Sequence, residues 1–403
     1  MRKFTYEAKD SSTDKVVKAT VQADSERSAA KLLIDQGFAP ITIKEQKDGE
    51  GFFDRLSNRI TTKDRVVFTR QLSTLIAAGL PFSQSLRTVL DQTPNKRLKA
   101  VTQEVIVSVE GGRSLHESFS KHPAVFDKLF LALVASGEAS GTLDDALQRV
   151  ANQQEKDAAI VGKIRGAMIY PLIVLVVIFG VMAFMLLTVV PQVEKLYKDL
   201  NQDLPFLTST MVTLSQFLLN FWWLVIIVIG LAGYFGAQYL KTESGIRMAD
   251  QLKLNVPGFN GMFRKLYMAR FARTTQTLLV TGVAMLDALR ISSEAVSNTV
   301  ISDNIDRASE QVKGGKALSV SLATQTYIPE LLPQMVRIGE QSGRIDEMLG
   351  KTAKIYEDEL DQEIQGISTA IEPVLMVVLA LMAGGMVAAI LLPIYGLVDT
   401  MSI

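Results

Sequence analysis

Cysteine is absent from this 403-residue chain, and its net charge is zero. Without cysteine there can be no disulfide, thiolate metal site or cysteine nucleophile. Lys plus Arg and Asp plus Glu are both 42, so the charge balance indicates neither a nucleic-acid partner nor an acidic one. The first six residues lack an apolar core. We therefore expect no cleavable signal peptide and a cytoplasmic N-terminus.

Motifs for chemistry are also lacking. A phosphate-binding P-loop needs two glycines, a lysine and a hydroxyl at fixed spacing. Next to Gly315-Lys316, the nearest candidate, Glu310 replaces the first glycine and Ala317 replaces the hydroxyl. The two histidines, His116 and His122, lie in no metal-ligand pattern. We predict no catalytic residue, no cofactor and no metal, and therefore a protein that is not an enzyme.

A five-residue phrase occurs twice, 202 positions apart. It contains Gly137, Glu138, Ser140 and Gly141 in the first copy and Gly339, Glu340, Ser342 and Gly343 in the second. Other landmarks recur before it, including the Gly-Gly pairs at 111–112 and 314–315. Matches that keep their spacing indicate a duplication. The sequence predicts two homologous helical domains, at about 64–165 and 267–370.

Two interpretations of the phrase remain open. Glycine permits the backbone angles at which one helix ends and the next begins, so the phrase predicts a helix–helix corner. In the first interpretation Glu138 and Glu340 accept N–H bonds and fix this corner. In the second they present carboxylates to a cytoplasmic partner. Ser114 with Glu117, and Thr142 with Asp145, also have the spacing of a capping box.

Three apolar stretches are long enough to cross a bilayer. They predict transmembrane helices at 167–190, 217–239 and 371–392, the third with its uncharged part from Pro373. Trp222 and Trp223 lie near one end of the second, where interfacial aromatics are common. The alternative of buried core helices is disfavoured because no face of the three stretches is polar.

Basic residues predict the orientation. Lys163 and Arg165 precede the first stretch, and seven Lys or Arg residues follow the second, between 241 and 273. Both helical domains are therefore expected in the cytoplasm, joined by a basic connector at 240–266. The loop at 191–216 and the tail at 393–403 are expected outside it. The sequence thus predicts a multi-pass membrane protein with its C-terminus outside the cytoplasm.

A small α+β unit is expected at 1–46, followed by a linker or short helix at 47–63. Residues 4–8, 16–21 and 38–43 have the pattern of strands, and a helix is expected between the second and third. The predicted fold class is therefore mainly α: two homologous cytoplasmic helical-bundle domains, three transmembrane helices and this small unit.

Two further sets of residues are candidates in the membrane. Tyr170-Pro171 and Glu372-Pro373 open two of the apolar stretches. Glu372 is expected at the membrane–water interface near a helix N-terminus. It would have a structural role there or bind another transmembrane helix. Gly384 and Gly385 belong to a face of small residues that we predict to pack against another segment or another protomer.

The chain resembles the family of type II secretion F and type IV pilus assembly platform proteins. The resemblance rests on the doubled Gly-Glu-x-Ser-Gly phrase, on both Gly-Gly pairs, and on Tyr170-Pro171 against Glu372-Pro373. Leu392-Pro393-Ile394-Tyr395 and the N-terminal Phe4-x-Tyr6-x-Ala8 also fit. One departure is the first turn, where the family usually has a glycine and this chain has Ser11-Ser12-Thr13-Asp14.

The resemblance implies a non-enzymatic platform in the inner membrane of such a machine. Its expected partners are a cytoplasmic hexameric ATPase, pilin or pseudopilin subunits, other inner-membrane assembly proteins, the lipid bilayer and further copies of itself, but no nucleic acid. Two other hypotheses are a parallel-repeat transporter and a membrane scaffold or receptor. A transporter usually carries charged residues within the bilayer. A receptor is expected to have a larger outer domain than this chain provides.

Overall fold

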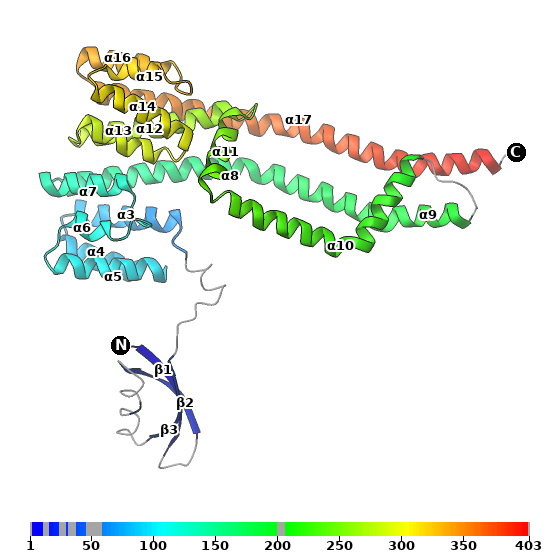
Figure 1. Ribbon diagram of the computed structural model, residues 1–403, viewed down its shortest axis with the longest axis horizontal. Helices are drawn as coiled ribbons and strands as arrows, with labels where there is room; N and C mark the ends of the chain where they lie inside the picture. The colour runs from blue at the N-terminus through cyan, green and yellow to red at the C-terminus, as the bar shows by residue number, and fades with distance from the viewer. Residues whose placement is uncertain are drawn as a thin grey trace. The chain divides into compact units, whose positions relative to one another are not determined.

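The computed structural model describes residues 2–10, 16–23, 30, 38–45, 59–199 and 206–401 (Figure 1). The chain divides into two units. The first comprises Met1–Thr61 with Pro94–Lys99, and the second comprises Thr62–Thr93 with Ala100–Ile403.

The first unit contains an antiparallel sheet of β1 (Arg2–Asp10), β2 (Val16–Ala23) and β3 (Phe38–Glu45), in the order β2-β1-β3. The β1–β3 register shifts between Glu7 and Ala8, where Pro40 stands opposite Ala8. Proline cannot donate to the ladder, which fits an irregularity at this point. The strands fall on the stretches that the sequence predicted. The helix expected between β2 and β3, and the linker or short helix expected at 47–63, lie largely outside the described residues. The α+β character of the unit therefore stays a prediction.

The first repeat is a bundle of short helices followed by one long helix. Its helices are α3 (Thr62–Ala77), α4 (Phe82–Gln92), α5 (Lys96–Glu110), α6 (Leu115–Ser120), α7 (Lys128–Ser140) and α8 (Leu143–Phe184). Phenylalanines fill its core: the ring of Phe119 lies 4.6 Å from that of Phe126 and 5.0 Å from that of Phe130. Ser114 caps α6 by accepting the Glu117 N–H, as its spacing predicted. Thr142 makes no side-chain cap bond at the start of α8, so the same spacing did not predict a cap there.

The second repeat has the same order of helices. They are α12 (Asn260–Val280), α13 (Met285–Ala295), α14 (Thr299–Lys313), α15 (Leu318–Ala323), α16 (Leu331–Ser342) and α17 (Ile345–Met401). Buried Leu322, Ile328 and Leu332 occupy the positions of the three phenylalanines. Corresponding glycines also have positive φ in both copies: Gly79 and Gly282, Gly112 and Gly315, Gly141 and Gly343. The two repeats therefore share their turns although their core side chains differ.

The last helix of each repeat continues into the apolar stretch. α8 passes through a π-helical turn, η1 (Met185–Val189), into α9 (Val190–Asp199), and α17 is one helix of 57 residues. Tyr170 and Pro171 lie inside α8, and Glu372 and Pro373 lie inside α17. The prediction that helices start at these prolines is wrong. Proline lacks the backbone N–H and so removes one hydrogen bond from the helix. In membrane helices this is tolerated because neighbouring groups can satisfy the freed carbonyl.

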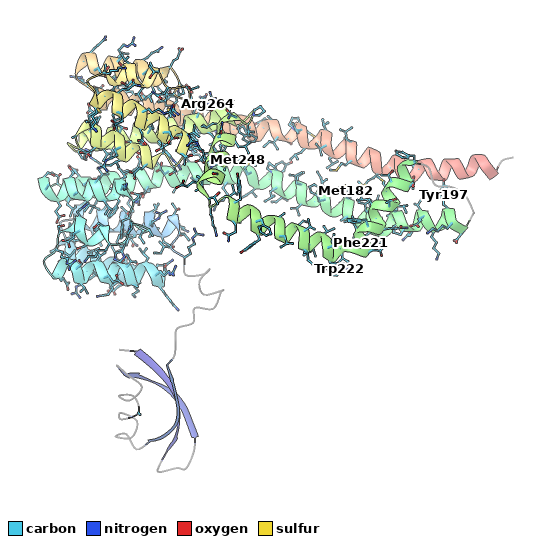
Figure 2. The ribbon with its side chains drawn as sticks, viewed as in Figure 1. Met182, Tyr197, Phe221, Trp222, Met248 and Arg264 are labelled. Carbon is cyan, nitrogen blue, oxygen red and sulfur yellow. The ribbon has the colours of Figure 1, made fainter. Side chains whose placement is uncertain are left out.

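The segment predicted as an outer loop, 191–216, is mostly helical. It comprises most of α9 and the beginning of α10 (Phe206–Tyr239), while residues 200–205 lie outside the described part. A small apolar cluster of Leu186, Val190 and Val212 packs the two helices together. A loop was expected because the segment is rich in polar residues and its amphipathic pattern, over the 10 residues of α9, is short. α10 has a non-helical residue at Phe221, immediately before Trp222 (Figure 2).

Among the described residues, three helices are long and apolar enough to cross a membrane: those at 143–199, 208–239 and 345–388. Their most apolar windows are only 17%, 0% and 6% buried inside the protein. Helices with this much exposed apolar surface are not the buried core helices of a water-soluble protein. α11 (Glu243–Asn255) connects the second of these helices to the second repeat.

Candidate functional site

The repeated phrase closes one helix and orients the next. Gly141 and Gly343 are the C-caps of α7 and α16, with φ of 74° and 69°. The residue after each glycine donates its N–H to the carbonyl of the first glycine of the phrase, at 2.9 Å in both copies. Only this last glycine lies outside the helix, so the expected five-residue corner is in fact a last helical turn with its cap. Glycine is favoured there because other residues are strained at such φ.

The first glycine of each phrase permits close helix contact. A Cβ at Gly137 would lie 2.6 Å from the Cβ of Ala146, in α8. A Cβ at Gly339 would lie 2.7 Å from the Cα of Ile345, at the start of α17. Both distances are below van der Waals contact. The phrase therefore holds the start of each long helix directly against the helix before it.

Both serines of the phrase bond within their own helices. The Ser140 hydroxyl donates to the Ser136 carbonyl at 2.7 Å, and the Ser342 hydroxyl donates to the Ile338 carbonyl at 2.8 Å. These local bonds occupy the hydroxyl protons. Each serine thus stabilises the last turn of its own helix.

Both glutamates of the phrase cap a short helix elsewhere in their repeat. Glu138 accepts the N–H groups of Leu115 at 2.8 Å and His116 at 3.1 Å, at the start of α6. Glu340 accepts the N–H of Ser319 at 3.2 Å and its hydroxyl at 2.5 Å, at the start of α15. A carboxylate at a helix N-terminus satisfies free donors and is favoured by the helix dipole. This geometry is what the corner interpretation requires.

A second doubled feature was missed in the sequence. The Arg70 guanidinium on α3 binds both carboxylate oxygens of Glu155 on α8, at 2.5 Å. Arg273 on α12 binds Glu357 on α17 in the same way, at 2.9 and 2.8 Å. The Arg70 hydrogen bond lowers the pKa of the Glu155 carboxyl. The signal was present, because the two arginines and the two glutamates recur at the spacing of the duplication.

The two copies differ in what surrounds them. α7 of the first repeat contacts the second repeat: Lys128 pairs with Glu294 at 2.6 Å, and the Ser136 hydroxyl donates to the Thr281 carbonyl at 2.7 Å. Ile338 on α16 occupies the position that corresponds to Ser136, and its side chain is 51% exposed. The first corner is therefore close to the contact between the repeats, whereas this face of α16 is open.

The candidates in the membrane helices are not tightly packed. Tyr170 and Glu372 are exposed, and a Cβ at Gly384 or Gly385 would meet nothing within 4 Å. Gly385 lines an apolar cavity of about 210 Å³ among the helices α8, α10 and α17 and the π turn. Much of the lining is methionine, from Met182, Met185, Met211, Met382 and Met386. Figure 2 shows Met182 on the α8 side. Gly384 is exposed and Gly385 is half-buried beside this cavity, so the Gly384 side of the small-residue face is available to a further segment.

No group of three His, Cys, Asp or Glu residues that could hold a metal occurs within the described ranges. The arrangement at both corners consists of caps, close glycine contacts and ion pairs. These features fix the geometry of helices and supply no reacting group.

Family comparisons follow the same division of the chain. The model of the type II secretion system protein F family matches twice, at residues 68–191 and 271–393. The model of the N-terminal domain of type II secretion system protein F matches residues 1–44. Each of the first two matches contains one helical repeat and its apolar stretch, so the duplication read from the sequence is confirmed.

Relatives with two kinds of name align over nearly the whole chain. The type IV pilus assembly protein PilC of Thermus thermophilus is 36% identical over 405 residues, covering 99% of each chain. PilC of Pseudomonas aeruginosa is 36% identical and covers 90% of this chain and 96% of its own length. The type II secretion system protein F of Xanthomonas campestris pv. campestris is 32% identical, covering 98% of both. This chain belongs to the type II secretion system protein F family, whose members serve secretion and type IV pilus machinery.

Proposed function

We propose that this chain is the inner-membrane platform of a type IV pilus, and that it couples a cytoplasmic hexameric ATPase to the assembly of pilin subunits into a fibre. The family and its names support a place in such a machine. The coupling, the ATPase and the pilin are the proposal.

The observation that carries the proposal is the continuity of the long helices. α17 begins at the corner of the second repeat and runs through the apolar stretch without interruption, over 57 residues. At 1.5 Å per residue this is about 85 Å, well over the thickness of a bilayer. The first repeat has a helical run of equal length, from Leu143 to Asp199. A displacement of either helical domain would be carried into the membrane by a hydrogen-bonded rod.

The orientation is part of the proposal. Basic residues before the first apolar stretch and after the second favour a cytoplasmic location for the domains at 64–165 and 267–370. The N-terminus would then be cytoplasmic, and the segment at 191–216 and the C-terminus would lie outside. This arrangement puts both corners on the side where ATP is available.

Pilus assembly is favoured over protein secretion by the identities alone. Relatives named for type IV pilus assembly are 33–36% identical, and those named for type II secretion are 30–32% identical. The difference is small, and a deletion strain tests it directly. Loss of surface fibres with normal secretion would support a pilus platform, and loss of secretion with normal fibres would support the secretion system. Normal fibres together with normal secretion would contradict the proposed function.

We propose the open face of α16 as the ATPase contact. Ile338 and Arg337 are exposed there, and the corresponding face of the first repeat faces the second repeat instead. Co-purification of the ATPase with Ile338→Glu tests this surface. Its matched control is Val107→Glu, at an exposed valine of α5 in the first repeat. We expect the ATPase to be lost with the first variant and kept with the second; retention with both would refute this surface.

The face of Gly384 and Gly385 is proposed as a contact between protomers or with another membrane helix. Small residues allow close approach of helices in lipid, and neither glycine is in close contact within the chain. Gly384→Leu, at the exposed glycine, should therefore reduce oligomer formation in detergent while the thermal stability of the chain stays unchanged. An unaltered oligomer would refute this contact.

A further inference from the structure

The short helix α11 begins directly at the end of a membrane helix. The Thr242 hydroxyl donates to the carbonyl of Tyr239, the last residue of α10, at 2.7 Å and accepts the Gly245 N–H at 3.2 Å. A Cβ at position 245 would overlap the Tyr239 carbonyl oxygen. Glycine there allows α11 to fold back against the end of α10. The start of α11 is thus fixed to the level at which α10 ends.

One face of α11 is docked on the second repeat. The Asp250 carboxylate accepts the Thr299 N–H at 2.9 Å and its hydroxyl at 3.1 Å, at the start of α14. Leu254 is fully buried in the core of that repeat. Arg247 pairs with Asp303 of α14 at 2.9 Å. These contacts fix the rotation of α11 about its own axis.

The other face of α11 exposes apolar side chains. Met248 and Leu252, one turn apart, are each 59% exposed. Tyr239 and Leu240 continue this surface at the end of α10, and the Tyr239 hydroxyl lies 3.9 Å from the Met248 sulfur. Lys241 is exposed beside them. In Figure 1 α11 runs across the direction of α10, and Figure 2 places Met248 where α11 follows α10.

We propose that α11 is an interfacial helix that binds the surface of the lipid bilayer, with Met248 and Leu252 in the boundary between headgroups and acyl chains. The inference rests on the proposal that α10 crosses the membrane. A helix crosswise to that span, attached at its end, lies in the plane of the interface. Exposed apolar side chains on such a helix insert into this boundary, tyrosine is enriched there, and lysine is attracted by anionic headgroups.

The occupant of this face is lipid because the face is continuous with the exposed apolar surface of α10. Tyr239 and Leu240 belong to both surfaces, and a bilayer that surrounds α10 reaches them without a second binding event. Through Asp250 and Leu254, the same helix holds the second repeat against the membrane. The tilt of the second repeat relative to the membrane would then be fixed at two points, α11 and α17.

Depth-dependent quenching tests the proposal, and the absence of native cysteine makes single labels simple to place. Met248→Cys and Leu252→Cys carry an environment-sensitive fluorophore in the full chain, reconstituted in vesicles of phosphatidylethanolamine and phosphatidylglycerol. Spin-labelled lipids quench either near the headgroups or deep in the bilayer. Val280→Cys, at an exposed position of the second repeat, is the aqueous control, and Leu231→Cys, within the apolar part of α10, is the deep control.

We expect severalfold stronger quenching of the labels at 248 and 252 by the shallow spin label than by the deep one. The label at 280 should respond to neither, and the label at 231 should respond to the deep one. Labels at 248 and 252 that behave like the one at 280, while the label at 231 is quenched, would overturn the inference and leave the platform proposal intact. Labels that are unquenched in vesicles but shielded from a water-soluble quencher in native membranes would overturn it in favour of a protein partner. An unquenched label at 231 would overturn the membrane crossing itself.

Discussion

Single residues at the two corners determine how closely the helices approach, and the glycines allow a direct test. Gly137→Ala would force the new methyl group against Ala146. Overpacking of this kind costs about 1–3 kcal/mol. Gly162→Ala is the matched control, because Gly162 is helical in α8 and has open space around its Cβ position. That change should stabilise the helix by about 0.5–1 kcal/mol. Thermal unfolding in detergent should separate the two variants in opposite directions; equal shifts would contradict the close contact.

The doubled arginine–glutamate pair permits a second comparison at this scale. Side chains of Arg273 and Glu357 are less exposed, at 17% and 21%, than those of Arg70 and Glu155, at 32% and 42%. Water and salt weaken the more exposed pair. A double-mutant cycle with alanine should give a coupling free energy of about 1 kcal/mol or less for Arg70 with Glu155. The cycle for Arg273 with Glu357 should give a larger value. A larger coupling for the exposed pair would show that geometry other than burial decides its strength.

Sequence reasoning was strongest where a residue's role is local. The turn glycines and the Ser114 cap follow from residues within four positions of each other. Glu138 binds the backbone of Leu115 and His116, more than twenty positions earlier, and no local pattern names those partners. The sequence allowed the prediction that the glutamates accept backbone N–H bonds. It did not identify α6 and α15 as the helices that donate them.

Among the elements, the π turn η1 has a specific partner. The buried Ser215 hydroxyl on α10 donates to the Leu186 carbonyl within the turn at 2.5 Å. A π turn disturbs the regular helical bonding, and a side chain from a neighbouring helix then supplies a donor. Ser215→Ala should destabilise the packing of α10 on η1 and α9 by about 1 kcal/mol.

Thr213→Ala is the control for that change, since the Thr213 hydroxyl donates only to the Ser209 carbonyl of its own helix. We expect a lower thermal midpoint for Ser215→Ala and almost none of this effect for Thr213→Ala. Identical midpoints for the two variants would exclude a structural role for the Ser215 bond.

Element positions were predicted better than element ends. The apolar stretches and the repeats were found from periodicity and hydropathy, but Pro171 and Pro373 were taken as starts of helices. They lie within helices because the amphipathic segments before them are held by packing in their repeats, as the burial of Leu147 and Leu349 shows. The helical parts of the segment at 191–216 were missed because α9 has only 10 residues and because α10 begins at Phe206, before the apolar stretch predicted at 217–239.

The whole molecule depends on contacts between the two repeats, which the duplication alone does not predict. Lys163 on α8 pairs with Asp361 on α17 at 2.6 Å. The corresponding residues, Gln365 and Ala159, could not form such a pair. A sequence read as two equal domains therefore gives no indication of how one faces the other. Contacts between unlike positions have to be found in the folded chain.

Charge exchange tests this contact. Lys163→Glu brings two carboxylates together and should lower the stability of the contact by about 1 kcal/mol, while Lys163→Glu with Asp361→Lys should restore most of it. Thermal unfolding and fibre counts for the three forms check the prediction. A double variant as impaired as the single one would show that the ion pair does not hold the repeats together.

Coupling through the long helices is the central claim, and an insertion in α17 tests it most directly. Four glycines inserted after Gly366, between the second repeat and the apolar stretch, would interrupt the rigid helix α17 with a flexible segment. The control is the same insertion after Gly112, in the exposed turn between α5 and α6. The measurement is the number of surface fibres per cell, with ATPase co-purification and membrane level compared in parallel. We predict that the α17 insertion keeps the protein in the membrane and bound to the ATPase but abolishes fibres, whereas the control insertion leaves them. Normal fibre numbers with the α17 insertion would contradict coupling through this helix.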